Sequence, residues 1–392
     1  MDADVLVVGA GQAGLAVTRQ LRRLGVAVLA VDGASRVGDS WRHRYTSLRL
    51  FTPRRFSGLP ELALPGDPEG YATATEFADY LEAFARKFEL PVQLGDGVKA
   101  LTRPDGSFVA TLRSGHVLQA RVAIIASGGF QSPRVPAVAA GLANDVQQLS
   151  PSTYRRPDDV RGTRVLVVGD GATGRDIAAE LADGRHVTLS SGRPRRLMPE
   201  RVLGVSTWSW LRRLGLLGSP ANSPVGRLMQ RADPFPDRQR SLEDLRGLRV
   251  LIRPRLTSAS GRNIGFADGS AHTAESIIWC VGYRDDSSWV QIAGAIAADG
   301  QFLHSGGRSP VDGLYFVGRP WQRNWASALI MGADADAAAI AREVAARLGQ
   351  DARPLLPKAL GSARSRTPRC LARRTGRRRR GSSLCPVDWP RR

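Results

Sequence analysis

Apolar and polar positions along the chain follow two patterns: short continuous apolar runs, and stretches in which apolar residues recur every three or four positions. Residues 4–8 form the first apolar run, residues 12–24 have helical spacing, and residues 26–32 form a second run. The same order returns over residues 164–189. Short apolar runs that alternate with helical stretches are typical of parallel sheets connected by helices. The pattern therefore predicts an α/β fold with two strand–helix–strand units.

The rest of the pattern predicts that the second unit interrupts the first. Residues 198–247 are less regular, and we interpret them as a helical insertion. Further elements are expected at residues 75–90 (helix), 98–112 (hairpin), 122–126 (strand), 277–282 (strand), 314–317 (strand) and 332–348 (helix). We expect a second domain at residues 160–275, after which residues 276–348 return to complete the first.

The turn between strand and helix carries glycines at the same spacing in both units. The first turn reads Gly9-Ala10-Gly11-Gln12-Ala13-Gly14, and the second reads Gly169-Asp170-Gly171-Ala172-Thr173-Gly174. A G-x-G-x-x-G turn that follows a strand and opens a helix brings backbone N–H groups and a helix N-terminus to a pyrophosphate. The sequence therefore predicts two nested Rossmann-like domains that bind two dinucleotides, with all these glycines and Gln12, Ala13, Ala172 and Thr173 at the binding turns.

The residues after each unit indicate which nucleotide binds there. Asp32 ends the second strand of the first unit, where a carboxylate accepts hydrogen bonds from ribose hydroxyls and repels a 2′-phosphate. No acid follows the matching strand of the second unit, which leads instead into Ser191 and Arg193. A hydroxyl and guanidinium groups suit the 2′-phosphate of NADP, and Arg175 adds charge nearby. We therefore predict FAD in the first site and NADPH in the second.

The charge of the chain does not by itself indicate a nucleic-acid partner. Of the net charge of +20, +11 falls on residues 351–392, which hold thirteen Arg or Lys and two Asp. This tail lacks apolar periodicity, so we expect residues 352–392 to be a basic, disordered tail. No specific nucleic acid is expected as a partner, although a protein whose tail contacts nucleic acid stays an alternative.

Several classes of chemistry are disfavoured by the residues present. The cysteines Cys280, Cys370 and Cys385 form no C-x-x-C pair, so the chain lacks a redox dithiol of that kind. The five histidines show no ligand spacing, and no metal is predicted. Neither a transmembrane run nor a secretory signal is evident, so we predict a cytoplasmic protein.

Together these motifs resemble the class B flavin-dependent monooxygenases, the flavin-containing monooxygenase-like group, over residues 3–345. Gly38-Asp39-Ser40-Trp41 is similar to the group's G-[GD]-x-W motif, and Ile278-Trp279-Cys280-Val281-Gly282-Tyr283-Arg284 is similar to its A-T-G-Y-R strand. The resemblance implies a first FAD-binding part over residues 1–150, an NAD(P)H-binding domain over residues 160–275 and a second FAD-binding part over residues 276–348. Gly38, Asp39 and Trp41 are then expected beside the flavin.

The resemblance also implies FAD contacts at Val98, Gly128 and Gly318, and a helix N-terminus near Gly332 that stabilises the reduced flavin. The chain departs from the group at two points. Ser150 stands where the signature histidine of the group belongs, although Tyr154 fits its last position. These two residues are the only catalytic candidates, and both are weak ones. At the second point Arg319 follows Gly318, where many two-nucleotide flavoproteins have Gly-Asp at the ribityl chain.

The activity implied by the resemblance is an NADPH-consuming monooxygenase. Hydride from NADPH reduces the flavin, O2 forms a C4a-(hydro)peroxyflavin, and a small amine or sulfide is oxygenated. The missing histidine favours an alternative, an NAD(P)H oxidase or electron-transfer flavoprotein of the same fold that does not oxygenate. The expected partners are a small-molecule substrate and O2, and a homodimer is compatible with this chemistry.

Overall fold

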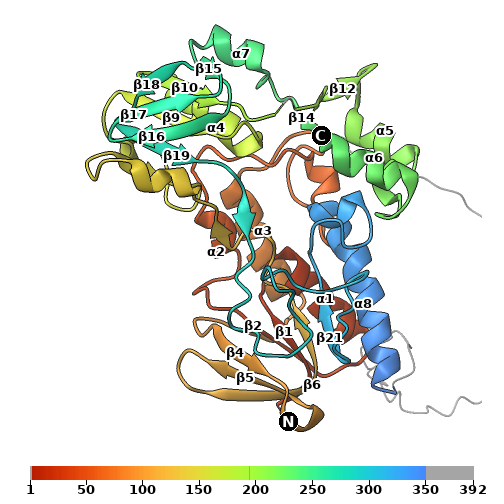
Figure 1. Ribbon diagram of the computed structural model, residues 1–392. Coiled ribbons are helices and arrows are strands. Elements are labelled where there is room, and N and C mark those ends of the chain that lie inside the picture. The colour runs from red at the N-terminus through yellow and green to blue at the C-terminus, as the bar shows by residue number, and fades with distance from the viewer. Residues whose placement is uncertain (1, 194, 350–392) are drawn as a thin grey trace, which may run out of the picture. The chain divides into compact units, whose positions relative to one another are not determined.

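The computed structural model describes residues 2–193 and 195–349, so the predicted tail at 352–392 lies outside the described residues (Figure 1). The first sheet has seven strands: β1 (Ala3–Val8), β2 (Val28–Val31), β3 (Val92–Gln93), β4 (Val98–Thr102), β5 (Phe108–Leu112), β6 (Val117–Ile125) and β21 (Leu314–Phe316). The order β3-β2-β1-β6-β21 is parallel, and β5 and β4 continue antiparallel from the start of β6.

Both faces of the first sheet are buried, which explains its continuous apolar runs. Val5 and Val7 of β1 lie in one core cluster, while Leu6 and Val8 lie in the cluster on the opposite face. The helices of this domain are α1 (Gln12–Arg23), α2 (Asp39–Arg42), α3 (Ala74–Lys87) and α8 (Ala333–Arg347). Helix α1 contacts both α3 and α8, and α2 contacts α3.

The second sheet repeats this plan with five parallel strands in the order β15-β10-β9-β19-β8. Its elements are β8 (Gln147–Leu149), β9 (Arg164–Val168), β10 (His186–Ser190), β15 (Leu251–Arg253) and β19 (Ser276–Trp279), with the helices α4 (Ala172–Leu181) and α7 (Leu242–Gly247). An antiparallel meander follows β15 and consists of β16 (Leu256–Ser260), β17 (Asn263–Phe266) and β18 (Ala271–Thr273). The predicted α/β fold with two Rossmann-like units is confirmed.

Two boundaries differ from the sequence prediction. Strand β19 was expected to return the chain to the first sheet, but it pairs with β9 and β8 in the second sheet. Residues 147–149 were assigned to the first domain, and they too lie in the second sheet as β8. The physical reason is that an apolar run such as Ile277–Trp279 identifies a buried strand without identifying its neighbour. The return to the first sheet therefore begins after Cys280.

Two short strands join the sheets. The chain passes from the first sheet to the second through β7 (Ser132–Pro133) and returns through β20 (Tyr283–Arg284). These two segments pair with each other, antiparallel, with Tyr283 opposite Pro133 and Arg284 opposite Ser132. The outward and return connections thus form a single two-stranded link.

The insertion between β10 and β15 consists of short strands and helices. They are β11 (Leu197–Met198), β12 (Arg201–Val202), β13 (Val205–Ser206), α5 (Thr207–Arg213), η5 (Leu216–Gly218), α6 (Pro224–Ala232) and β14 (Phe235–Pro236), followed by α7. Its inner side packs Trp208 and Leu211 against Phe56 and Trp325 of the first domain. None of the helices in the described ranges is long and apolar enough to cross a membrane.

Candidate functional site

The first glycine turn separates two roles among its glycines. Gly9 has φ +108°, and a Cβ there would lie 2.7 Å from the Ala126 carbonyl oxygen. A Cβ on Gly14 would lie 1.9 Å from the Gly9 oxygen, so only glycine lets α1 approach β1 this closely. A Cβ on Gly11 would meet nothing within 4 Å. Two glycines are therefore required for packing, and Gly11 leaves open backbone that a ligand can approach.

The second turn has the same geometry. Gly169 has φ +104°, and its Cβ would lie 2.4 Å from the Cys280 carbonyl oxygen. The Cβ of a residue at position 174 would lie 1.8 Å from the Gly169 oxygen, while Gly171 again meets nothing within 4 Å. Cys280, just after β19, thus occupies the place that Ala126, just after β6, has in the first domain. The chain carries two equivalent turns.

Both turns open onto a helix N-terminus without competing groups. Helix α1 begins after Gly11 and α4 begins after Gly171, and neither has a side-chain cap or an acid in its first turn. Free N–H groups and the positive end of the helix dipole attract a phosphate. The residues present therefore fit the pyrophosphate of a dinucleotide at each turn.

Asp32 lies at the first turn, as the sequence predicts. Its Oδ2 accepts a hydrogen bond from the Ala10 N–H at 2.7 Å, and its Oδ1 accepts one from the Ala34 N–H at 2.9 Å. A carboxylate has about four acceptor positions, so two remain for ribose hydroxyls. The two backbone bonds hold this carboxylate at the end of β2, next to the open glycine.

The segment Gly38–Trp41 forms α2 and is held by its own contacts. A Cβ on Gly38 would lie 2.6 Å from the Ala78 oxygen, so this glycine lets α2 pack on α3. Asp39 is buried; burial would raise its pKa, but bonds from Ser35 Oγ and the Arg36 N–H outweigh burial and lower the pKa. Trp41 donates from Nε1 to Gln12 Oε1 at 3.2 Å. The motif therefore fixes Trp41 against the first turn of α1.

The loop after β21 lies directly on that same turn. A Cβ on Gly318 would lie 2.7 Å from the Ala13 Cβ. The next residue, Arg319, donates to the Gly128 oxygen at 3.1 Å and forms an ion pair with Asp285, in which each side chain is only 11% exposed. Sequence reasoning noted that Arg319 replaces an aspartate but missed this ion pair, for which Asp285 beside the Tyr283-Arg284 motif was the available signal.

Two other predicted FAD contacts have different surroundings. Val98 is the first residue of β4, and its side chain packs against the core on one face of the first sheet. Gly332 caps α8, and a Cβ there would lie 2.1 Å from the Ala326 oxygen. The first turn of α8 carries Asp334 and Asp336, whose negative charges partly cancel the positive potential at this end of the helix. Burial raises the pKa of Asp336, which makes its negative charge less favourable and so weakens this cancellation.

Asp170 organises the second site, a role that sequence reasoning missed. Its carboxylate is buried and accepts from Ser191 Oγ at 2.8 Å. Arg175 is also buried and donates from Nε to the Asp170 carbonyl at 2.8 Å and from Nη1 to the Arg240 carbonyl at 2.7 Å. The guanidinium of Arg175 is thus engaged inside the protein, and Ser191 is held at the end of β10. The signal available in the sequence was an acid between the two glycines.

Arg193 and a second arginine, Arg195, converge on one carboxylate. Arg193 Nη2 lies 3.1 Å from Asp233 Oδ2, and Arg195 Nη1 lies 2.5 Å from the same oxygen. The Arg193 and Asp233 side chains are 64% and 53% exposed. The two guanidinium groups thus converge on a single anion, the carboxylate of Asp233.

The weak catalytic candidates lie in the second domain. Tyr154 is fully buried in its core and donates from Oη to Glu180 Oε2 at 2.7 Å; burial raises the pKa of its hydroxyl. Ser150 Oγ lies 2.7 Å from Ser152 Oγ. Burial raises the pKa of the Cys280 thiol to about 12. Cys280 is therefore a neutral thiol at physiological pH and a poor nucleophile.

Comparison with known proteins agrees with this geometry. A family model described as pyridine nucleotide-disulphide oxidoreductase matches residues 6–209. An uncharacterized CzcO-like oxidoreductase of Geobacillus kaustophilus is 42% identical over 335 residues, which are 85% of this chain and 96% of that protein. The probable indole-3-pyruvate monooxygenase YUCCA9 of Arabidopsis thaliana is 26% identical, covering 73% of this chain and 76% of that protein.

Among solved structures, a flavin-containing monooxygenase from Stenotrophomonas maltophilia is similar to the chain, with a TM-score of 0.74 and 25% identity. The match covers 89% of this chain and 100% of that one. The predicted resemblance to flavin monooxygenases is confirmed, and so is the prediction of an enzyme, which removes the non-catalytic alternative. FAD and NADPH, the predicted cofactors, are those that members of these families bind. The chain thus belongs to the pyridine nucleotide-disulphide oxidoreductase family, as an FAD-dependent oxidoreductase of the flavin monooxygenase type.

Proposed function

We propose that the protein is a cytoplasmic, NADPH- and O2-dependent monooxygenase that oxygenates a small amine or sulfide. The observation that carries the proposal is the pair of open glycine turns, which equips one chain with two dinucleotide sites. FAD supplies the redox chemistry when it is bound, and the protein supplies binding, orientation and a dry environment. The similarity to monooxygenases supports the reaction class.

In the first site, we assign the FAD pyrophosphate to the backbone at Gly11 and the ribose to Asp32. The two backbone N–H groups that already bind Asp32 keep its carboxylate oriented. Trp41 is held by Gln12 at the start of α1, which favours a position of the aromatic ring beside the turn. These residues bind and orient, and no proton transfer is assigned to them.

In the second site, we assign the NADPH pyrophosphate to the backbone at Gly171 and the 2′-phosphate to Ser191, Arg193 and Arg195. Arg175, predicted from the sequence as a phosphate contact, is better described as a support, because its donors bind the Asp170 and Arg240 carbonyls. The 2′-phosphate must displace Asp233 from the exposed Arg193 and from the partly buried Arg195. Selectivity for NADPH then depends on how well it competes with that carboxylate.

The loop between Gly318 and Gly332 is shielded by aromatic side chains. Trp325 lies in this loop, and the centroid of its ring is 6.0 Å from that of Trp208. The Trp208 ring is stacked on Phe51, with 6.2 Å between the ring centroids. Reactive oxygen chemistry requires that water be kept out, so that the oxidising equivalent reaches the substrate. We assign this insertion–loop contact the task of keeping water away from that side of the site.

An anaerobic titration with NADPH, followed by oxygen and a panel of amines and thioethers, tests the proposal. We expect NADPH to bleach the flavin, and oxygen to give a transient absorbance before the oxidised spectrum returns. Oxygenated product should form in proportion to NADPH consumed. Stoichiometric hydrogen peroxide with every substrate, and no transient, would contradict the monooxygenase assignment.

A pair of glycine variants tests the two sites separately. Gly11→Ala and Gly171→Ala each add a methyl group to open backbone, so the fold should be retained. We expect Gly11→Ala to lose FAD, and Gly171→Ala to stay yellow while its reduction by NADPH slows ~10-fold or more, since a displaced phosphate forfeits charged hydrogen bonds. Gly174→Ala is the contrasting control, because its Cβ would overlap the Gly169 oxygen and prevent folding. Full FAD binding by Gly11→Ala would contradict the assigned turn.

A second candidate function is an NADPH oxidase of the same fold. Ser150 stands in place of the histidine, and its hydroxyl is within hydrogen-bonding distance of the Ser152 hydroxyl. The Tyr154 hydroxyl donates a hydrogen bond to Glu180. Neither residue is thus a free proton donor. Peroxide yield per NADPH, measured in the experiment above, distinguishes the two candidates.

A further inference from the structure

The insertion contains a long segment without negative charge. Residues 201–232 include five arginines and neither aspartate nor glutamate. The flanking acids are Glu200 and Asp233, so the segment begins and ends at carboxylates. Such an absence over 32 residues concentrates positive charge on β12, α5 and α6.

The same segment exposes large apolar side chains. Among the described residues, five of the eleven exposed large hydrophobic side chains lie here. They are Val202 (42% exposed), Leu203 (88%), Leu214 (67%), Val225 (39%) and Leu228 (62%). Exposed apolar side chains that gather in one small insertion suit an interaction site better than apolar residues spread over the whole surface. We call these five residues, with Arg212, Arg213, Arg227 and Arg231, the insertion surface.

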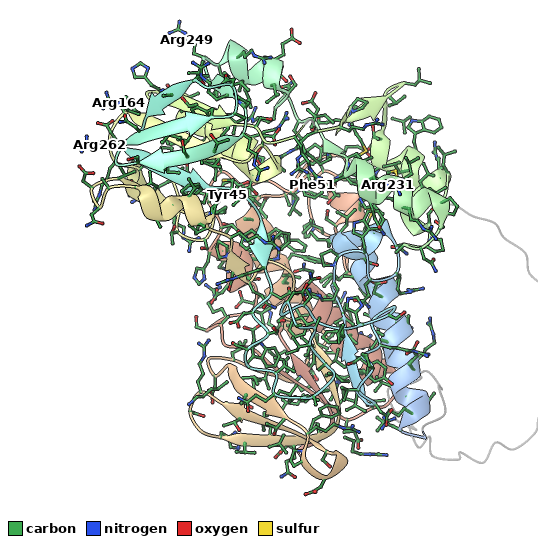
Figure 2. All side chains as sticks on the ribbon, viewed as in Figure 1. Tyr45, Phe51, Arg164, Arg231, Arg249 and Arg262 are labelled. Carbon is green, nitrogen blue, oxygen red and sulfur yellow. The ribbon has the colours of Figure 1, made fainter. Side chains whose placement is uncertain are left out.

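Helix α6 shows how the two kinds of residue are arranged. Val225 and Leu228 are three positions apart and so share one side of the helix, while Arg227 and Arg231 are four apart and share the adjoining side. Gly226 is buried, and a Cβ there would lie 2.2 Å from the Pro220 oxygen, which fixes the inward side of α6. The helix therefore presents two apolar side chains to solvent with two arginines along one side of them. Arg231 is labelled in Figure 2.

The guanidinium groups of the insertion surface are not neutralised by neighbours. Arg212 lies over the Phe56 ring at 4.7 Å, Arg213 lies over Trp210 at 5.7 Å, and Arg227 donates to the Asn222 carbonyl at 3.0 Å. Within residues 2–193 and 195–349, none of these arginines nor Arg231 forms an ion pair. Four cations are thus available to an anionic partner.

We propose that the insertion surface docks the protein on an anionic phospholipid bilayer. Leucine and valine side chains enter the boundary between headgroups and acyl chains, and arginines bind the phosphates while their stems stay in the apolar layer. No described helix is long and apolar enough to span the bilayer, and the proposed contact is with its surface.

Charge favours this partner over two others. A second copy of the chain related by a two-fold axis would bring the same arginines face to face, and like charges oppose that contact. Nucleic acid would satisfy the arginines but would leave the exposed leucines in water. Only an anionic surface with an apolar layer below it satisfies both kinds of side chain.

The location gives docking a consequence for the site. The inner side of the insertion contacts the loop between Gly318 and Gly332 through Trp208 and Trp325. A membrane under the insertion surface would lie close to that loop, which suits a substrate that partitions into lipid. The docking proposal itself stands independently of the proposed reaction.

Vesicle binding of the full-length protein tests the inference. We expect sedimentation with vesicles of phosphatidylcholine and phosphatidylglycerol, and little with phosphatidylcholine alone. The triple variant Leu203→Ser, Leu214→Ser, Leu228→Ser should bind the anionic vesicles at least ~10-fold more weakly than the wild type, because three apolar side chains no longer enter the bilayer. The double variant Arg227→Gln, Arg231→Gln should also bind about tenfold more weakly, and its binding should depend less steeply on salt concentration.

The control is Val117→Ser, Val135→Ser, which removes exposed apolar side chains outside the insertion and should bind like the wild type. All variants keep the basic tail, so its charge is constant. Reduction of the flavin by NADPH should be the same in all of them, which separates this test from that of the reaction. Wild-type binding by the triple variant, absence of vesicle binding altogether, or loss of a dimer in the triple variant would each overturn the proposal.

Discussion

At the scale of single residues, the carboxylate of Asp233 holds two guanidinium groups at the expected 2′-phosphate site. Replacing Arg193 by alanine removes one of them and leaves the fold intact, because its side chain is 64% exposed. We expect the KM for NADPH to rise ~10-fold and the KM for NADH to change little, since a charged hydrogen bond to phosphate contributes about 1.5–3 kcal/mol. Steady-state reduction with each coenzyme measures this.

A matched control exists elsewhere on the second domain. Arg262 is paired with Asp145 in a comparably exposed ion pair, with side chains 49% and 58% exposed. Arg262→Ala should change neither KM. Equal effects of Arg193→Ala on NADPH and NADH would remove the phosphate role from Arg193.

Cys280 provides a second test at this scale. The test asks whether its thiol takes part in the chemistry, as the description of the family as disulphide oxidoreductases suggests. Because burial raises the pKa of its thiol to about 12, Cys280 stays protonated through neutral and mildly alkaline pH. Ala126 fills the equivalent place in the first turn, so Cys280→Ala should fold normally and retain full NADPH-driven flavin reduction. A large loss of the reduction rate, with FAD content unchanged, would show that the thiol takes part in the chemistry.

At the scale of secondary-structure elements, helix α3 begins with a capping box. Thr73 Oγ1 accepts from the Glu76 N–H at 3.1 Å, and Glu76 Oε2 accepts from the Thr73 N–H at 2.7 Å. The bond from the Thr73 backbone, and then that from Arg54, lowers the pKa of Glu76 from 4.5 to about 2. Thr73→Ala should reduce the free energy of unfolding by about 1 kcal/mol.

The pH dependence of this cap follows from the lowered pKa. A depressed carboxyl pKa contributes stability above the unfolded value of 4.5, and that stability is lost as the pH falls toward about 2. The difference in Tm between the wild type and Glu76→Ala should therefore be constant near neutral pH and shrink below about 4.5. Thermal unfolding at a series of pH values checks this, and a constant difference down to low pH would contradict it.

The elements also show what the sequence could and could not reveal. Strands such as β1 and β9 were predictable because both of their faces are buried, which gives a continuous apolar run. The glycine turns were predictable because their spacing reflects a steric requirement of the fold itself. The sheet to which β19 belongs was not predictable, because the apolar pattern of a buried strand does not indicate which strand lies beside it.

Polar contacts in the candidate site were harder to foresee. Asp170 with Ser191, and Arg319 with Asp285, are separated by 21 and 34 residues along the chain. The sequence shows the two acids next to recognisable motifs, but it does not show their partners, because these contacts depend on how the domains fold. Residue types at the ends of strands led to the prediction of phosphate and ribose contacts there, but they did not show which arginines already have partners within the protein.

At the scale of the whole molecule, the carboxylate of Asp176 connects the second domain to the first. Arg238 donates from Nη2 to both oxygens of Asp176, each at 2.7 Å, and Tyr45 of the first domain donates to Asp176 Oδ2 at 3.1 Å. Tyr45 is labelled in Figure 2. Asp176 lies in α4, two residues after the last glycine of the second turn. This carboxylate therefore ties the second dinucleotide turn to the first domain.

Asp176→Ala should loosen that connection. We expect about 2 kcal/mol of lost stability, because the partly buried Arg238 loses a charged partner. Anaerobic reduction by NADPH should slow severalfold with FAD content unchanged, as the nicotinamide is held less firmly. Asp145→Ala, which breaks the exposed pair with Arg262, is the control. An unchanged reduction rate in Asp176→Ala would mean that this tie does not align the coenzymes.

The insertion leaves the second sheet after β10 and rejoins it at β15, and these two strands are hydrogen-bonded neighbours. Helix α7 alone could make the crossover between them. Residues 197–236 thus form a separable insertion, or cassette. Ancestral chains could have gained, lost or exchanged this cassette without changing the strand order of either nucleotide fold. The penalty of removal would fall on Phe51, Phe56 and Trp325, which would meet water. Exchanging cassettes between related chains is therefore a route to new substrate ranges, provided that the incoming cassette covers these three rings.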